Sequence, residues 1–213
     1  MKIVVLAGGL STERDVSLVT GANVTEALKK SGHQVILLDV FLGYENEGRP
    51  IENIFERADE IQAIAEGISE VAPDIASVKR MRKDQSACFF GPNVIQICQM
   101  ADVVFMALHG SNGEDGRIQA TFDLFGIKYT GTGHLSSAIA MDKEISKQFF
   151  ESAKVPTPRG VVAIKDHAYL TFEETGLALP VVVKPCCGGS SIGTTIVRNK
   201  ADYEKALADS FQY

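Results

Sequence analysis

The sequence has no tryptophan, only four cysteines and seven prolines, and no long uninterrupted apolar segment. A helix that spans a bilayer needs about 20 consecutive apolar residues, so no contact with a membrane is expected. The 21 Lys and Arg residues are outnumbered by 27 Asp and Glu, which gives a net charge of −6. This balance argues against a general nucleic-acid binder, because such proteins carry a basic face. One basic cluster is expected to be a solvated helix face or loop, not a binding patch: Lys79, Arg80, Arg82 and Lys83.

The cysteines and the first residues bear on the compartment. The apolar run at residues 1–6 is cut off by Gly8 and Gly9, so it reads as a first strand and not as a signal peptide. Four cysteines without an export signal predict reduced thiols in the cytoplasm. Cys186 and Cys187 are neighbours, but the sequence has no paired C-x-x-C spacing. We therefore expect buried or incidental thiols and no metal site within this chain.

The first half of the chain has the pattern of an α/β domain. Apolar, β-branched runs at residues 2–7, 34–40 and 102–108 predict three buried parallel strands. Apolar positions from Val16 to Leu28 mark a helix that ends near Gly32. Strand, helix and strand in this order predict a right-handed βαβ unit. Between residues 41 and 101 the pattern is weaker and predicts an amphipathic helix over residues 51–64 and a shorter one over residues 94–98.

The second half is punctuated by glycine and proline. It predicts a helix over residues 114–125, a short strand at residues 128–130, and a junction at residues 131–133. A helix over residues 136–154 should follow, and then a β-rich section with strands at residues 160–164, 180–184 and 194–197. A Gly-rich loop at residues 187–193 separates the last two strands, and a final helix is expected from about Lys200.

The segment GGLSTERDVS, residues 8–17, lies between the first strand and the first helix. One interpretation is a dinucleotide site, with Asp39 as the acid that would bind the ribose. The G-x-G-x-x-G glycines are missing, however, and Glu13 and Asp15 would repel a pyrophosphate. Such carboxylates suit an ammonium group instead. They could equally be only helix-capping residues.

Two further segments carry groups that can do chemistry. Residues 108–116, LHGSNGEDG, follow the carboxyl end of a buried strand, where open α/β sheets place ligands, so His109 is a candidate site residue. Lys184 ends an apolar strand and should need an anion if its ammonium is buried. The following GGSSIG turn offers backbone N–H groups and hydroxyls that can hold phosphate, although the G-x-x-x-x-G-K-[ST] motif is missing.

Four segments together resemble those of the D-alanine–D-alanine ligases, ATP-grasp enzymes of cell-wall synthesis. They are, in family order, GGLSTERDVSL, ALHGSNGEDG, YTGTGHLSSAIAMDK and PVVVKPCCGGSSIG. The resemblance implies a Rossmann-like α/β domain over residues 1–131 and an incomplete ATP-grasp central subdomain over residues 132–213. Cys186-Cys187-Gly188 departs from the family's loop, which often has an acidic or small residue before Gly-Ser-Ser.

The resemblance also implies roles for single residues. Glu13 would hold the first D-alanine through its amine, Val16 and Ser17 would line that subsite, and His109 would lie in the substrate pocket. The ATP phosphates would be gripped by two lysines and two loop serines: Lys143, Lys184, Ser190 and Ser191. Ser190 would also bond with the catalytic glutamate, which makes Glu13 and Ser190 the expected catalytic pair.

The implied reaction phosphorylates the carboxylate of one D-alanine with ATP, and the amine of a second D-alanine then attacks the acyl phosphate. Mg²⁺ ligands would lie in a C-terminal ATP-grasp domain that this chain lacks, so a truncated form with negligible activity is expected. D-alanine and ATP are the expected ligands and a homodimer the expected assembly. Three alternatives stay open: an NAD-binding oxidoreductase, a ligase that takes D-lactate or D-serine second, and a non-catalytic binding or scaffolding remnant.

Overall fold

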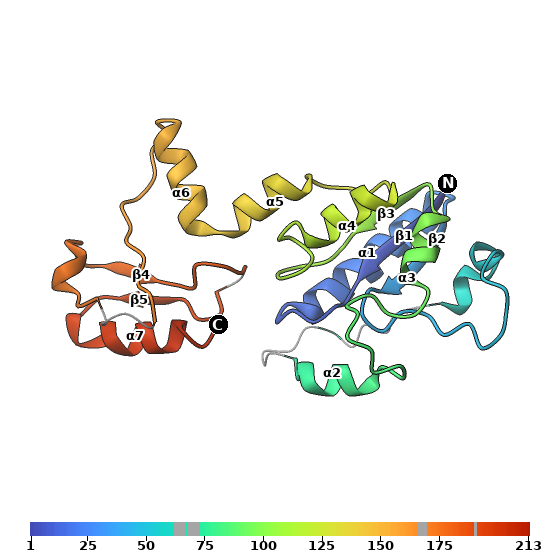
Figure 1. Cartoon of the computed structure of the whole chain (residues 1–213), viewed down its shortest axis with the longest axis horizontal. Coiled ribbons are helices and arrows are strands. Elements are labelled where there is room, and N and C mark those ends of the chain that lie inside the picture. Colours follow the sequence, from blue (N-terminus) through green and yellow to red (C-terminus); the bar gives the residue numbers. More distant parts are fainter. Residues whose placement is uncertain (62–66, 68–72, 166–169, 190) are drawn as a thin grey trace. The chain divides into compact units, whose positions relative to one another are not determined.

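The computed structural model describes residues 1–61, 67, 73–165, 170–189 and 191–213, which form two compact units, Met1–Ala138 and Ile139–Tyr213. Figure 1 traces the elements along the chain. The first unit holds β1 (Lys2–Ala7), α1 (Arg14–Lys30), β2 (Gln34–Asp39), the 3-10 helix η1 (Ile54–Glu60), α2 (Ile75–Met81), α3 (Val94–Gln99), β3 (Val103–Met106) and α4 (Arg117–Phe125). Helix α5 (His134–Met141) crosses the division between the units.

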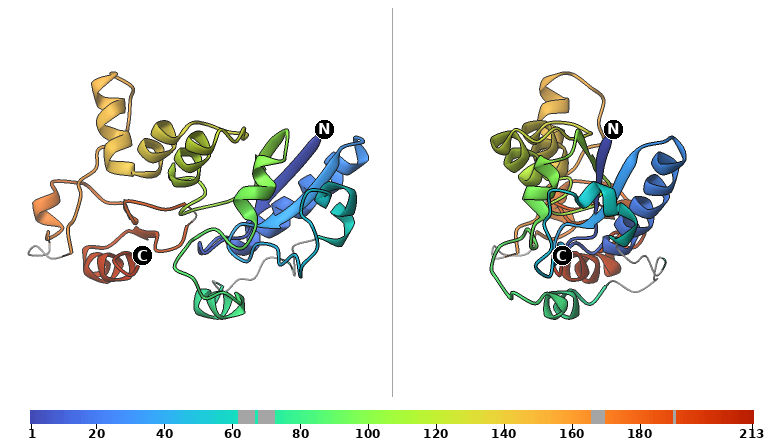
Figure 2. Two further views of the ribbon diagram at one scale, coloured as in Figure 1. Left: turned by 45° about the vertical axis from the view of Figure 1, so that its right-hand side comes forward. Right: turned by 90° about the vertical axis from the view of Figure 1, so that its right-hand side faces the viewer.

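The core of the first unit is a parallel sheet in the order β2-β1-β3. Successive residues of β1 point to opposite faces, and both faces are buried. Ile3 and Val5 pack beneath α1, whereas Val4 and Leu6 pack with apolar residues of η1, α3 and α4. The right-hand view of Figure 2 shows α1 (blue) on one side of the strands and green segments on the other. The predicted α/β fold with a parallel sheet is confirmed.

Helix α1 lies very close to the sheet at Gly21. A Cβ atom at this position would lie 2.8 Å from the Cβ of Ala7 and 2.9 Å from the Cδ1 of Leu37. Only hydrogen fits there, so the glycine sets how near the helix comes to β1 and β2.

The region between residues 41 and 101 differs from the predicted pattern. Ile54, Phe55, Ala58 and Ile61 are buried as the spacing indicated, but they belong to a 3-10 helix with non-helical φ/ψ at Arg57. The α-helix predicted over residues 51–64 is therefore wrong in type, and its end lies outside the described residues. Helix α3 confirms the shorter prediction, and α2 was not predicted.

The basic cluster is correctly predicted as helix face or loop except at Arg82. This side chain is buried and donates to the Cys88 carbonyl at 2.5 Å and to the Asp84 carboxylate at 2.9 Å. Its guanidinium also lies 5.0 Å from the centre of the Phe41 ring. Arg82 is thus the anchor of the loop that leads to Phe90, whose carbonyl it also bonds.

Two predictions near the end of the first unit need adjustment. Helix α4 begins at Arg117 and not at residue 114, because residues 110–116 form turns and Gly116 has a φ of 89°. The strand predicted at residues 128–130 is a single parallel bridge between Val104 and Tyr129.

The second unit holds α6 (Lys143–Ser152), η2 (Glu173–Thr175), β4 (Val181–Val183), β5 (Thr195–Val197), η3 (Lys200–Asp202) and α7 (Tyr203–Ser210). Strands β4 and β5 pair antiparallel, and α7 packs on one face through Tyr203 and Leu207 against Val183 and Val197. The strands predicted at residues 180–184 and 194–197 and the last helix are confirmed. Residues 160–164 form no strand. Among the described residues, no helix has the length and apolar character needed to cross a membrane.

The single helix predicted over residues 136–154 is wrong. The chain breaks at Asp142, whose φ of −91° and ψ of 111° are extended, and α6 starts anew after it. The Asp142 carboxylate accepts hydrogen bonds from the backbone N–H groups of Glu144 and Ile145, at 2.9 and 3.0 Å. It therefore caps α6, and these bonds hold the pKa of this carboxyl below its usual value, with the Ile145 bond the largest cause.

Candidate functional site

Two loops meet at the carboxyl edge of the parallel sheet. β1 runs directly into Gly8 and Gly9, and the neighbouring β3 is followed by the loop of residues 108–116. Ligands of open α/β sheets bind at this edge. Glu13 and His109, which the sequence singled out, lie on these two loops.

A buried ion pair between Arg14 and Asp39 holds the loop after β1 in place. Arg14 donates to the carboxylate of Asp39 at 2.5 Å and to the Gly9 carbonyl at 2.7 Å, and both charged side chains are buried. The other Asp39 oxygen accepts from the N–H groups of Phe41 and Leu42. Asp39 is therefore engaged within the protein, and the sequence-based alternative that it binds a ribose loses its support.

The same ion pair explains Gly8. Its φ is 76°, and a Cβ atom there would lie 2.3 Å from Asp39 Oδ2 and 2.9 Å from Arg14 Nη1. The glycine thus makes room for the ion pair, whereas a dinucleotide fingerprint would need it for a close approach to pyrophosphate.

Ser17 and His109 connect the two loops. The Ser17 hydroxyl, fully buried, accepts from the Gly8 N–H at 2.9 Å and donates to the Ala107 carbonyl at 2.7 Å. The His109 carbonyl accepts from the Ser11 hydroxyl at 2.7 Å, and its ring Nε2 lies 3.3 Å from the Thr20 hydroxyl. Ser17 therefore holds the Gly8 loop in place through these two hydrogen bonds. A contact of Ser17 with a ligand remains a prediction.

The Glu13 carboxylate, like that of Asp15, has no partner among the described residues. The side chain is half-buried at the N-cap position of α1, yet it makes no capping hydrogen bond. It lies beside Gly110, where an added Cβ would be 2.9 Å from Glu13 Oε2. The capping interpretation is therefore wrong for Glu13. A half-buried carboxylate left unpaired is a ready partner for a cationic ligand. Val16, one turn on, is also half-buried.

The second loop is held by its own carboxylates, which sequence reasoning missed. Glu114 accepts from the Gly110 N–H at 2.7 Å, and Asp115 accepts from the Asn112 N–H at 2.8 Å. Arg117 donates to Asp115 at 2.9 Å. The signal was present in the sequence as acidic residues, one four positions after a loop glycine and one three positions after a loop asparagine. These bonds leave Glu13 as the free carboxylate facing Gly110.

The second unit carries the predicted phosphate-binding residues. Lys143, the first residue of α6, donates through its backbone to the Cys186 carbonyl at 3.0 Å and through Nζ to the Gly188 carbonyl at 2.7 Å. Its ammonium therefore lies against the loop that follows β4. Ser191 of that loop is exposed, and Ser190 lies outside the described residues.

The position of Lys184 differs from the expectation that its ammonium is buried. Its side chain is exposed, so the expected need of a buried ammonium for an anion does not arise. Val183 packs beneath α7 and Val181 is partly buried beside it, whereas Val182 and Lys184 are exposed. A role for Lys184 toward phosphate rests on the resemblance alone.

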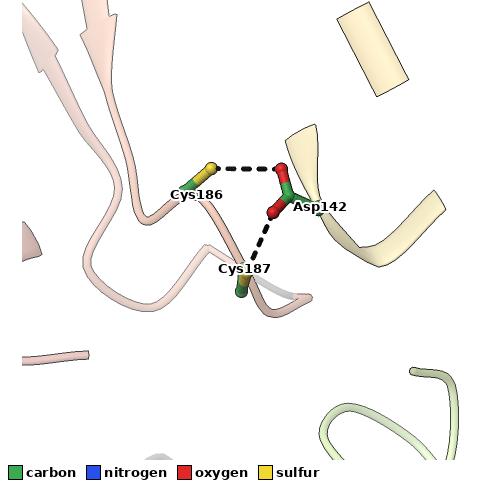
Figure 3. A group of neighbouring side chains, drawn as sticks. All are labelled: Asp142, Cys186 and Cys187. Carbon is green, nitrogen blue, oxygen red and sulfur yellow. Dashed lines mark hydrogen bonds between the residues drawn. The ribbon is translucent and has the colours of Figure 1, made fainter. Parts of the chain in front are cut away.

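The loop also brings two thiols to the cap of α6, as Figure 3 shows. Cys186 and Cys187 each lie within hydrogen-bonding reach of the Asp142 carboxylate. Burial raises the pKa of the Cys186 thiol. This is the one group of three metal-ligating side chains among the described residues. Two thiols and one carboxylate do not fit Mg²⁺, which prefers oxygen ligands in octahedral geometry.

Comparison with known proteins places the chain in a family. A family profile described as D-ala D-ala ligase N-terminus matches residues 2–132, and one described as D-ala D-ala ligase C-terminus matches residues 157–213. The D-alanine–D-alanine ligase of Lacticaseibacillus casei (strain BL23) is 43% identical over 213 residues, and that of Pediococcus pentosaceus is 44% identical over 217 residues. Both matches cover 100% of this chain but only 58% and 60% of those proteins.

Solved structures agree. The crystal structure of D-alanine–D-alanine ligase from Bacillus anthracis has a TM-score of 0.66 and 28% sequence identity, and the match covers 100% of this chain and 54% of that chain. The structure of the B. anthracis ligase complexed with ATP has a TM-score of 0.63 and 27% identity, over 100% of this chain and 56% of that chain. The chain belongs to the D-alanine–D-alanine ligase family of ATP-grasp enzymes, as its four sequence segments predicted.

Proposed function

We propose that the protein ligates two D-alanines to D-alanyl-D-alanine with ATP, for the synthesis of peptidoglycan precursors. Its family supports this activity, as do relatives named D-alanine–D-alanine ligase at 43% and 44% identity. Because the chain spans about 60% of those relatives, the activity is proposed for the whole protein. The observation that carries the proposal is the unpaired Glu13 carboxylate at the carboxyl edge of the sheet.

In this proposal Glu13 binds the ammonium group of the first D-alanine. A charge-assisted hydrogen bond between an ammonium and a carboxylate is about twice as strong as a neutral one. Val16 and Ser17 belong to the same subsite, with Ser17 as a support of the Gly8 loop, and His109 belongs to the substrate pocket. Holding the amino acid by its amine leaves its carboxylate free to react.

The ATP phosphates are assigned to Lys143, Lys184, Ser190 and Ser191. The crystal structure of the B. anthracis ligase complexed with ATP supports ATP as the co-substrate. A carboxylate oxygen of the first D-alanine bonds the γ-phosphorus as the bond to ADP breaks. The amine of the second D-alanine then bonds the acyl carbon as phosphate leaves. Lysine ammoniums offset the charge that develops on the phosphoryl oxygens.

Five further parts of the proposal rest on the family and on general expectation. The domains are residues 1–131 and 132–213, the assembly is a homodimer, and the compartment is the cytoplasm. Mg²⁺ would neutralise phosphate charge, with ligands other than the described residues of this chain. The second substrate is D-alanine, as in the names of the relatives. Supplying D-lactate or D-serine in its place to the whole protein tests that choice.

The binding step can be tested on this chain with D-alanine in ligand-observed NMR. We expect saturation transfer to D-alanine, a weaker signal with L-alanine, and loss of the D-alanine signal in Glu13→Gln. The matched control is Asp15→Asn, which removes the same charge two residues further along α1, on another side of the helix. Transfer that survives Glu13→Gln, or that Asp15→Asn also abolishes, would refute an amine site at Glu13.

The nucleotide assignment is tested separately. Lys143→Met should weaken the binding of ATP, measured by fluorescence of a labelled ATP analogue. Lys205→Met should not, because it removes an exposed charge of α7. Equal affinities for ATP in the two variants would contradict a phosphate contact of Lys143.

A further inference from the structure

Cys186 and Cys187 converge on one carboxylate although they are neighbours in sequence. Cys186 Sγ lies 3.4 Å from Asp142 Oδ1, and Cys187 Sγ lies 3.8 Å from Asp142 Oδ2, as the dashed lines of Figure 3 mark. A backbone bridge between Asp142 and Cys187 holds the two segments together. The three candidate ligand atoms all lie within 4.8 Å of one another.

The spacing of these atoms can be compared with that of a tetrahedral metal site. Zinc bonds of about 2.3 Å to sulfur and about 2.1 Å to oxygen put the bound atoms about 3.6 Å apart. The distance of 3.8 Å between Cys187 Sγ and Asp142 Oδ2 is close to this value, whereas the 3.4 Å contact of Cys186 Sγ is with the other oxygen, Oδ1. Because one ligand atom of each residue lies within 4.8 Å of the other two, a rotation of the Cys186 side chain would bring its sulfur toward a cation bound to Cys187 and Oδ2.

One oxygen of the Asp142 carboxylate, Oδ2, is available to bind a cation. Asp142 Oδ1 accepts both capping N–H groups of α6, whereas Oδ2 has only the Cys187 thiol as a described partner. Coordination through Oδ2 thus leaves the helix cap intact. Ligand carboxylates are commonly held by hydrogen bonds in this way, which fixes their orientation.

We propose that Asp142, Cys186 and Cys187 form a site for a thiophilic divalent cation such as Zn²⁺. Soft thiolate ligands select zinc over magnesium, so the site is separate from any metal that serves ATP. Three protein ligands leave the fourth tetrahedral position to water.

The charges of the three side chains also favour the binding of a divalent cation. Two thiolates and a carboxylate carry three negative charges, and a divalent cation leaves one. The Lys143 ammonium, which bonds the carbonyls of Cys186 and Gly188, lies beside the cluster to offset it. An occupied site would tie the start of α6 to the loop after β4, and so restrain the segment that carries Ser191.

The other two cysteines provide contrasts. Cys98 is buried in the apolar core of the first unit, and burial raises the pKa of its thiol to about 12. Cys88 is exposed and belongs to no group of three ligands among the described residues. Cys88→Ser is therefore a matched control for the removal of an accessible thiol.

The test is a titration of the reduced chain with Co²⁺, kept under a phosphine reductant that prevents a disulfide between the neighbouring thiols. We expect a thiolate-to-cobalt absorption band in the near ultraviolet that saturates at one Co²⁺ per chain and is lost on addition of Zn²⁺. Cys186→Ser and Cys187→Ser should each weaken the band and lower Co²⁺ affinity by about tenfold or more. Asp142→Asn should lower affinity and keep the band.

Cys88→Ser should leave the titration unchanged. Circular dichroism of each variant, recorded without metal, separates loss of a ligand from loss of the fold. A reduced chain that gives no thiolate band overturns the proposal. So does a band that persists in the Cys186→Ser/Cys187→Ser double variant, or one that disappears in Cys88→Ser.

Discussion

The buried ion pair between Arg14 and Asp39 stabilises the first unit. Replacing one carboxylate oxygen of Asp39 by an amide nitrogen should therefore lower the free energy of unfolding. Asp39→Asn keeps the shape of the side chain and an oxygen that can accept from the N–H groups of Phe41 and Leu42. It replaces the charged partner of Arg14 by a neutral group. The guanidinium, exposed by only 8%, then keeps the Gly9 carbonyl and loses its counter-ion.

Leaving one charge of a buried pair without its partner costs about 3–5 kcal/mol. With a urea dependence of about 2 kcal/mol per molar, the unfolding midpoint of the first unit should fall by about 2 M. The surface pair of Glu26 and Lys30 offers the contrast, because its side chains are 66% and 74% exposed. Glu26→Gln should leave the midpoint unchanged, since exposed pairs contribute little.

The assay is urea unfolding followed by circular dichroism, with hydrogen exchange of the β1 amides to report on the first unit. Adding Arg14→Met to Asp39→Asn removes the unpaired charge, so the double variant should be more stable than Asp39→Asn alone. An unchanged midpoint in Asp39→Asn, or a double variant no more stable than the single one, would show that the buried charge of Arg14 does not depend on Asp39.

Three other predictions use the same folded chain. Gly21→Ala should destabilise it by about 1–3 kcal/mol in urea unfolding, because the added Cβ would meet residues of β1 and β2. Gly133→Ala is the control and should not destabilise the chain, because an added Cβ there has open space. Equal effects of the two substitutions would contradict the close approach of α1 to the sheet. Cys98 should resist a thiol reagent at pH 8 until the chain unfolds, since burial raises its pKa to about 12, and fast labelling would contradict this. The hydrogen bond from His134, with one from a tyrosine, holds the pKa of Asp123 below its usual value. Its stabilisation should therefore be present above the unfolded-state pKa and be lost as pH falls through the folded one, and His134→Ala should raise the Asp123 pKa in a carboxyl NMR titration.

The sheet and the first βα turn were predictable because they depend on local pattern. The apolar runs of β1 and β2 and the glycines after β1 report burial and backbone freedom directly. The placing of Glu13 at the carboxyl edge followed from the same pattern. Its isolation did not, because two nearby donors bond other groups: the Ser11 hydroxyl donates to the His109 carbonyl, and the Gly110 N–H donates to Glu114.

The features that the sequence did not predict share a physical cause. They depend on partners that are distant in the sequence or that lie in loops. Arg82 is buried by carbonyls of a loop that has no periodicity. The cluster at Asp142 joins residues 44 and 45 positions apart, so cysteine spacing could not indicate it. The break between α5 and α6 had a local signal, since Asp followed by Lys-Glu is a common helix start. Apolar spacing across the break obscured it.

We propose that the carboxyl edge of the sheet accepts an ammonium group at Glu13, and a crystal structure of the chain with D-alanine would show whether it does. We predict the D-alanine nitrogen about 2.7–3.2 Å from the Glu13 carboxylate and beside Gly110. D-alanine bound elsewhere, or a nucleotide phosphate bound at the start of α1 in its place, would rule out an ammonium site at Glu13.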